Sequence, residues 1–414
     1  MITACQQEKY LEATRAACRW YYKNQNTDDR PWGGIKNSAD HGRFIYEYFP
    51  EDRMGRGGVV WSQALGIMAL DAVNARSLRD PEKGIRRQSA ILAGEYLQKL
   101  QYTNPAEKEN FGGFAETVPG DRFSYPRDAA TGGMGLCALY RMTGDRKYLD
   151  AAVRFADWYR NHGSDSDGWP YITYDFLEKE GTNLLPPEPG TKETEMKEAI
   201  KGDWQAGGAL FYYYLASVTG NRKYIEDYML PMMPRLINFY EKNPPNRILE
   251  GFHCEVEVSY GNDDFALVTL LSAYMATGNK RYFEAARDRI KGLLLIMDQQ
   301  TGKFPSFGGT FVCGITMHVL NELEKHLGRK PDPKLVSAVE KVAENGLQVQ
   351  AFDYNDMRIH GGFWGQTNYD AARYCIHHRT TGYATIFYSM LGSKTVIPYY
   401  NCLGWDIPKK SKKK

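Results

Sequence analysis

Two kinds of helical segment alternate along the chain, and this alternation restricts the fold more than any other feature. One kind is rich in Gly, Ala and aromatic residues and is apolar on nearly every side, which is typical of buried helices. These segments cover 59–75, 128–142, 203–218, 262–276, 311–327 and 369–391. The other kind is amphipathic and charged, and covers 7–24, 84–101, 146–161, 222–242, 280–298 and 334–349. Six alternating pairs predict an all-α (α/α)6 toroid, with six inner helices inside six outer ones.

A turn that occurs three times supports this architecture. Thr143-Gly144-Asp145-Arg146-Lys147-Tyr148 recurs in closely similar form at 219–224 and 277–282, each time between an apolar helix and an amphipathic one. Gly ends the first helix in a left-handed conformation, and the basic residues begin the next helix. A seventh hairpin is a second interpretation, because 191–201 also has a helical pattern. An open solenoid is the alternative fold, although the first and last units lack obvious polar caps.

The length of 414 residues exceeds the size at which one compact core usually stops growing, but a closed ring needs no such core. We therefore expect one toroidal domain over 1–408, followed by a solvated, disordered Lys-rich tail at 409–414. The net charge of +2 argues against nucleic-acid binding, and the absence of 18 consecutive apolar residues argues against a transmembrane segment. We expect a monomer or a weak oligomer.

No cofactor or metal is expected from the sequence. The seven cysteines are far apart and contain no C-x-x-C pair, which argues against a zinc knuckle and a disulfide framework. Asp165-Ser166-Asp167-Gly168 lacks the later bidentate Glu of a calcium loop. His377-His378-Arg379 lacks a third zinc ligand.

The first residues suggest a location. Ile2-Thr3-Ala4-Cys5-Gln6 resembles the end of a bacterial lipoprotein signal with Cys5 as the lipidated residue, although the charged and apolar regions that should precede it are missing. We expect a periplasmic or outer-membrane-attached protein, with an ordinary cytoplasmic amino terminus as the alternative.

The long connections between an outer helix and the next inner helix should all emerge on one face of the ring, where function tends to be located. Five of them combine aromatic residues with glycine, at Trp32-Gly33-Gly34, 111–114, 168–170, 304–309 and 361–365. Exposed rings in such loops would stack on sugars, with Trp32, Trp169 and Trp364 as the stacking residues. The alternative is that the rings plug the mouth of the barrel.

Hairpins with turns such as Thr143–Leu149 and loops with Gly-Gly-Phe resemble the α/α-toroid carbohydrate-active enzymes of bacteria, a group that includes polysaccharide lyases, unsaturated-uronide hydrolases, mannanases and sugar epimerases. The resemblance covers nearly the whole chain but is architectural, so it identifies no single activity. It implies a polysaccharide or oligosaccharide substrate on the loop face.

The titratable side chains indicate which reaction of that group to expect. Their set of His, Tyr, Asn and Arg resembles that of toroidal polyuronate lyases more than a site with two carboxylates. A lyase must neutralise the uronate carboxylate with Arg, His or Asn, and must then move protons with Tyr or His. We expect β-elimination on an alginate- or glucuronan-type polysaccharide, with Arg127 and Asn262 on the carboxylate and Tyr260 or Tyr369 as base and acid. His253 and His360 would support them.

Further polar residues on the same face are expected to bind substrate. They are His41, Arg43, Asp128, Asp263, Arg373 and His377. Asp370, Arg373 and His377 are spaced to share one stripe of the last inner helix.

A glycoside hydrolase is the alternative enzyme. It needs one protonated and one ionised carboxyl, which Asp128, Asp203, Asp263 or Asp264 could supply. Each of these residues also lies where a helix-capping Asp is common. A non-catalytic glycan-binding toroid is the third hypothesis.

Overall fold

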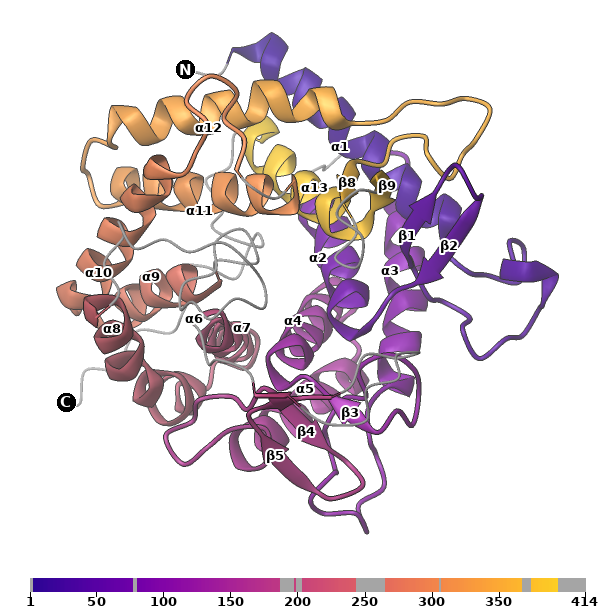
Figure 1. The fold of residues 1–414 in the computed structure, drawn as a ribbon, viewed down its shortest axis with the longest axis vertical. Coiled ribbons are helices and arrows are strands. Elements are labelled where there is room, and N and C mark those ends of the chain that lie inside the picture. Colours follow the sequence, from indigo (N-terminus) through magenta and orange to yellow (C-terminus); the bar gives the residue numbers. More distant parts are fainter. Residues whose placement is uncertain are drawn as a thin grey trace.

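The structure is a computed structural model and describes residues 3–76, 80–186, 197–198, 203–242, 265–304, 307–366 and 374–393. Within these residues, six helical segments line the inside of a ring (Figure 1). They are α2 (Val60–Arg76), α4 (Pro126–Thr143), the continuous α6 (Asp203–Ala206), η2 (Gly207–Ala209) and α7 (Leu210–Thr219), α9 (Phe265–Thr277), α11 (Phe307–His326) and α13 (His378–Gly392). Each packs against the next, and α13 packs against α2, so the ring is closed.

Six outer segments surround them (Figure 1). They are α1 (Ala4–Asn24), α3 (Lys83–Lys99), α5 (Arg146–Asn161), η3 (Tyr224–Met229) with η4 (Leu230–Met232) and α8 (Met233–Lys242), α10 (Lys280–Gly292) with η5 (Leu293–Leu295), and α12 (Pro333–Gly346) with η6 (Leu347–Val349). Each is amphipathic; α5, for example, buries Tyr148, Phe155 and Trp158 toward the inner ring. The predicted toroid is confirmed.

The repeated turn has the predicted chemistry. Gly144, Gly220 and Gly278 have φ values of 73°, 69° and 74°, and each N–H donates to a carbonyl in the last turn of the preceding helix. Because only glycine adopts this conformation without strain, it ends the inner helix. The next residue, such as Asp145, then accepts a hydrogen bond from the first turn of the outer helix.

Short strands join the long connections to one another. β1 (Ile45–Phe49), β2 (Met54–Gly57), β8 (Trp364–Gln366) and β9 (Tyr374–His377) form a sheet in the order β2-β1-β9-β8, which links the first connection to the last. β3 (Phe123–Ser124), β4 (Thr173–Asp175) and β5 (Glu180–Thr182) link the second connection to the third. β6 (Leu184–Leu185) pairs with β7 (Lys197–Glu198), and η1 (Trp32–Gly34) lies in the first connection.

Two element boundaries differ from the predictions. The last inner helix begins at His378 and not at 369, because 374–377 pair with β1 and β8 as a strand. His377 is therefore the N-cap residue of α13. The helical stripe expected for Asp370, Arg373 and His377 is wrong for His377, because this residue lies in a strand. In the proposed helix at 191–201, Lys197–Glu198 form a strand, and the other residues lie outside the described part.

Candidate functional site

The amino-terminal ends of α13, α2 and α4 lie side by side and gather the polar groups of the loop face. Hydrogen bonds fix the long connections to these helix ends: Phe44 N–H donates to Gln63 Oε1 at 3.0 Å, and Val60 N–H donates to the carbonyl of Glu116 at 2.9 Å. The second of these bonds places the Glu116 loop beside the start of α2. These helix ends form the candidate site.

Arg127 organises one half of the candidate site. It is the second residue of α4 and is 3 % exposed. Its Nη1 lies 3.2 Å from Asp128 Oδ1 and 3.2 Å from Thr131 Oγ1, and its guanidinium lies 4.9 Å from the ring centre of Phe265. Asp128 keeps a quarter of its side chain exposed, at 25 %. The Asp128 carboxyl group thus reaches solvent beside a buried cation.

Glu116 is the acid that this half of the site holds. It is buried on the second connection, and its Oε2 has no hydrogen-bond partner in the part of the chain that the structure describes. Burial raises the pKa of Glu116 well above its ordinary value, and the negative charges of Asp128 and Asp121 raise it further, while a hydrogen bond from Tyr125 N–H and the charge of Arg127 oppose the shift. The carboxyl is therefore protonated at a pH where Asp and Glu are usually ionised.

His377 and Glu47 form the other half, on paired strands β9 and β1. His377 Nε2 lies 3.5 Å from Glu47 Oε1, and Arg56 Nη1 lies 3.7 Å from Glu47 Oε2. The backbone N–H of Arg379 donates to His377 Nδ1 at 3.0 Å. A neutral His377 must then carry its proton on Nε2, facing the buried carboxylate.

Aromatic rings surround His377 at the start of α2. The Tyr46 ring lies edge-on to the ring of His377 at 5.0 Å and to the ring of Trp61 at 5.7 Å. Trp61 is partly exposed and follows Val60, whose N–H contacts the Glu116 loop. The candidate site thus combines a buried carboxyl with a raised pKa, a second carboxyl that is partly exposed, a histidine and aromatic side chains.

Four of the expected substrate-binding residues are engaged within the fold. Trp169 is 2 % exposed and packs under the Arg235 guanidinium, so neither face of its ring is open to a sugar. Arg43 is buried and binds the carbonyls of Gly58 and Thr117 together with Asp40. His41 Nδ1 lies 3.4 Å from Asp28 Oδ1, and Trp32 Nε1 donates to the carbonyl of Asn24.

The remaining expected residues divide into two groups. Trp364 is half-buried in β8 and packs against the core, and the ring of His360 lies among the rings of Phe352 and Tyr354 on the last connection. The second group lies outside the described residues and comprises His253, Tyr260, Asn262, Asp263, Asp264, Tyr369, Asp370 and Arg373. The roles expected for this second group stay predictions.

The Gly-Gly-Phe loops have a structural explanation. Gln101 Nε2 donates to the carbonyls of Gly112, on its own loop, and Ala151, on α5. Gln350 donates in the same way to the carbonyls of Gly361 and Ala13 on α1. Each loop is thereby held across the next outer helix.

Phe114 and Phe363, which follow these glycines, are fully buried. The loops therefore plug and fasten the ring, which is the alternative to sugar stacking for these two phenylalanines.

Sequence reasoning did not single out Glu116, Glu47 or His378. Glu116 lies on the predicted functional face two residues after Phe114, but a Glu in a polar loop carries no sign that it will be buried. Glu47 and His378 became visible only when β1 and β9 were paired. Among the described residues no group of three or more metal-ligating side chains occurs, and no helix there is both long and apolar enough to span a membrane.

No protein-family model matches the chain, and a comparison with curated proteins also gives no match. Solved structures match it over nearly their full lengths. The cellobiose 2-epimerase of Bacillus thermoamylovorans is 16 % identical, with a TM-score of 0.66 over 93 % of this chain and 98 % of the other.

A family 76 glycoside hydrolase (mannosidase) from Bacteroides thetaiotaomicron is 14 % identical, with a TM-score of 0.61 over 94 % of this chain and 97 % of the other. A D-mannose isomerase is 12 % identical, with a TM-score of 0.63 over 93 % and 96 %. At these identities the comparisons establish the fold: the chain has the α/α-toroid architecture of these sugar-acting enzymes.

Proposed function

We propose that this chain is a carbohydrate-processing enzyme that hydrolyses glycosidic bonds, with Glu116 as the proton donor and Asp128 as its ionised partner. The observation that carries the proposal is the raised pKa of the buried Glu116 carboxyl next to the partly exposed Asp128 carboxylate. A glycosidase needs such a pair, since one group protonates the leaving oxygen while the other acts as base or nucleophile.

The structural comparisons support a sugar substrate. They include a mannosidase of a glycoside hydrolase family, together with an epimerase and an isomerase of sugars. We therefore prefer hydrolysis to β-elimination as the proposed reaction, since none of these three structures is named as a lyase. The lyase hypothesis also depends on Tyr260 and Tyr369, which lie outside the described residues.

Epimerisation or isomerisation of a sugar is the second candidate function. It is favoured by His377, whose Nε2 faces the buried Glu47 carboxylate at 3.5 Å. A buried carboxylate that faces an imidazole N–H can take a proton from carbon and return it to the other face. In this reaction Glu47 would be the base, and the Nε2–H of His377 would be directed at its carboxylate.

One experiment separates these reactions. Wild-type protein is incubated with mannan, cellobiose and a uronate polysaccharide. Three products are followed: new reducing ends, inversion at C2 by NMR, and the ultraviolet absorbance of an unsaturated uronide. We expect reducing ends, and we expect Glu116→Gln to lower kcat by about 10²–10⁴-fold because it cannot donate a proton.

Glu109→Gln is the matched control, since Glu109 is exposed on the same connection and pairs only with Lys179 among the described residues. It should keep wild-type activity. Full activity in Glu116→Gln would refute the assignment of the acid. Inversion at C2 that disappears in His377→Ala, without reducing ends, would establish the second candidate instead.

A further inference from the structure

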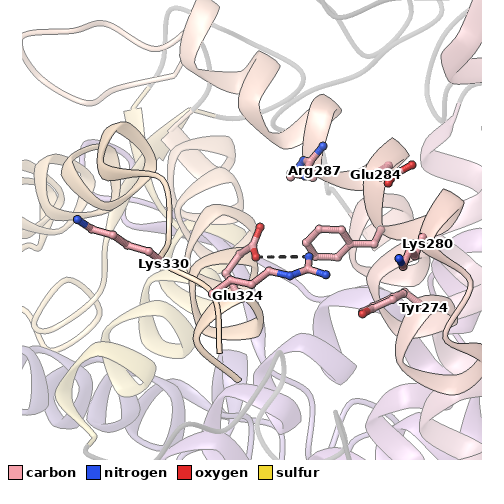
Figure 2. A pocket seen from close by; sticks show the side chains of 8 residues that line it. Tyr274, Lys280, Glu284, Arg287, Glu324 and Lys330 are labelled. Atoms are coloured by element: carbon pink, nitrogen blue, oxygen red, sulfur yellow. Dashed lines mark ion pairs between the residues drawn. The ribbon is translucent and has the colours of Figure 1, made fainter. Parts of the chain in front are cut away.

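A groove opens at the opposite end of the ring from the candidate site. It consists of two adjoining cavities of about 380 and 410 Å³ that share Arg287, Glu324 and Lys330. Figure 2 shows the side chains that line the first of them. Tyr274 and Glu324 line it from the carboxyl-terminal parts of α9 and α11, and Lys280 lines it from the start of α10. Since the inner helices run in parallel, this end is remote from the amino-terminal ends that hold Glu116 and His377.

The groove carries an excess of positive charge. Five cations line the two cavities, Lys280, Arg287, Lys291, Arg329 and Lys330, against the three carboxylates of Glu284, Glu324 and Asp332. Arg329 pairs with Glu324 at 3.7 Å, Lys291 pairs with Asp332 at 3.3 Å, and Arg287 pairs with the neighbouring Asp288 at 3.4 Å. Within the described residues no ion pair occupies Lys280 or Lys330, so both ammonium groups are available to an anion.

An aromatic ring fixes the guanidinium groups in place. Phe283 is buried, and the guanidinium carbons of Arg329 and Arg287 lie 5.0 and 5.7 Å from its ring centre. Cation–π contacts of this kind help to hold each guanidinium group in position. The groove therefore contains two guanidinium groups that the Phe283 ring holds in place, in addition to its lysines.

Buried acceptors complete the groove. Asn321 is 3 % exposed, lines the second cavity, and its Oδ1 has no hydrogen-bond partner among the described residues. Glu324 Oε2 is also buried without a hydrogen bond, although it faces Arg329 across 3.7 Å. Unsatisfied buried acceptors are costly, and hydroxyl groups of a ligand would satisfy them.

The turn that begins α10 departs from its two equivalents. At the same position in the other turns, Arg146 pairs with Asp150 at 3.4 Å and Arg222 pairs with Glu226 at 3.1 Å, each four residues further on. Lys280 has Glu284 at that spacing, yet no such pair forms within the described residues. The turn whose first cation is unpaired among the described residues is thus one that lines this groove.

We propose that this groove binds a small hydroxylated anion, a sugar that carries a phosphate or a carboxylate. Lys280 and Arg287 of α10 would bind the anionic group, and Lys330, on the far side of Glu324 (Figure 2), would add positive charge to the groove. Asn321 and Glu324 would accept hydrogen bonds from hydroxyl groups. Binding here is independent of the chemistry proposed at the other end of the ring.

Isothermal titration calorimetry of the full chain with glucose 6-phosphate, glucuronate, glucose and inorganic phosphate tests the proposal. We expect glucose 6-phosphate or glucuronate to bind, and these two ligands distinguish phosphate from carboxylate recognition. Neutral glucose and inorganic phosphate should bind at least about tenfold more weakly, because each lacks one of the two recognised features. Lys280→Ala/Lys330→Ala should weaken binding of the sugar anion by about tenfold or more.

Arg146→Ala/Lys147→Ala is the matched control, since it removes two cations from an equivalent turn and should leave binding unchanged. Asn321→Leu should weaken binding of the sugar anion.

The proposal is wrong if neither sugar anion binds to the wild-type protein, or if the Lys280/Lys330 double variant binds as tightly as the wild type. Equal affinity for glucose would refute the anionic ligand, and equal affinity for inorganic phosphate would refute the role of the buried acceptors. None of these measurements requires turnover, so the failure of the proposed hydrolase activity would leave them unaffected.

Discussion

Glu116 has a raised pKa in the folded protein, and this shift links activity to stability. The folded state binds its proton more tightly than the unfolded chain does, so the free energy of unfolding must fall as pH rises from the unfolded pKa to the folded pKa. The fall is at most about 1.4 kcal/mol for each pH unit of that window. We expect Glu116→Gln, which has no charge to lose, to be more stable than the wild type at pH 8 and equally stable at pH 4.

Urea unfolding of both proteins at the two pH values measures this difference. The same variant should have lost hydrolase activity, so a gain in stability would accompany a loss of function. An equal stability difference at pH 4 and pH 8 would contradict the link to titration and would indicate a change in packing instead.

Titration of His378 makes the free energy of unfolding change with pH in the opposite direction. It is fully buried, and burial lowers its pKa to about 3, although its Nδ1 bonds to the carbonyl of Ile45 at 3.0 Å. The unfolded chain therefore binds the proton first, and stability is lost as pH falls from about 6.5 toward 3. Between pH 6.5 and 5 the loss is at most about 2 kcal/mol.

His378→Asn retains an N–H donor at the position of Nδ1 but cannot become charged in this range. Relative to the wild type, it should therefore gain stability as the pH is lowered from 7 to 5, as measured by denaturant unfolding at each pH. A constant difference between the two proteins would show that His378 does not cause the pH dependence.

At the scale of elements, the loops that cross the outer helices depend on glycine for close contact. Gly361 has a φ of 90°, and a methyl group at this position would overlap the main-chain carbonyl oxygen of Ala16 on α1. Gly120 has a similar φ of 80°, but a methyl group there would meet nothing within 4 Å. Both substitutions strain the backbone, whereas only the first also forces two elements apart.

We expect Gly361→Ala to lower the free energy of unfolding by about 2–4 kcal/mol and Gly120→Ala by about 1 kcal/mol. Chemical denaturation of the two variants against the wild type measures the difference. Similar losses in both would mean that the backbone conformation alone, and not the contact with α1, restricts Gly361.

The helices were predictable from the sequence, while the strands were not. Apolar periodicity over 13 to 21 residues identified α1 and α9 within a few positions, because long segments average over local exceptions. β9 has four residues, and it is fixed by pairing with β1, which lies more than 300 positions away in the chain. No local pattern encodes such a pairing, and for this reason the start of the last helix was misplaced.

The candidate site was predictable only in part for the same reason. Arg127 and Asp128 begin an inner helix, so their place in the ring followed from helix periodicity alone. Glu116 depends on how a connection folds back on α2, and His377 on the register of β9 against β1. Burial of a loop residue is a tertiary property, and a single sequence does not show it.

At the scale of the whole molecule, closure of the ring gives every hairpin two neighbours. The seam is at α1, which packs on α13, and the last connection crosses it. There Trp20 Nε1 donates to the carbonyl of Arg358 at 2.8 Å, and the equivalent Trp158 on α5 donates to the carbonyl of Glu109 at 3.0 Å. The same contact thus occurs once at the seam and once inside the chain of hairpins, which makes the pair a matched probe of cooperativity.

If the chain is one domain, as the sequence predicts for 1–408, the ring should unfold as a unit. We expect Trp20→Phe to lose about 1–3 kcal/mol because it removes the indole donor to the carbonyl of Arg358. Trp158→Phe should lose less, because the hydroxyl of Tyr174 also donates to the carbonyl of Glu109, at 3.0 Å. Each should also move the entire transition, with far-UV circular dichroism and fluorescence changing together in urea. The alternative outcome is two separated transitions, with Trp20→Phe shifting only one of them and Trp158→Phe only the other. This would show that the hairpins unfold in independent blocks and that the seam is a boundary between blocks. A shared shift would identify the closing contact between α1 and α13 as part of the same cooperative core as the interior of the ring.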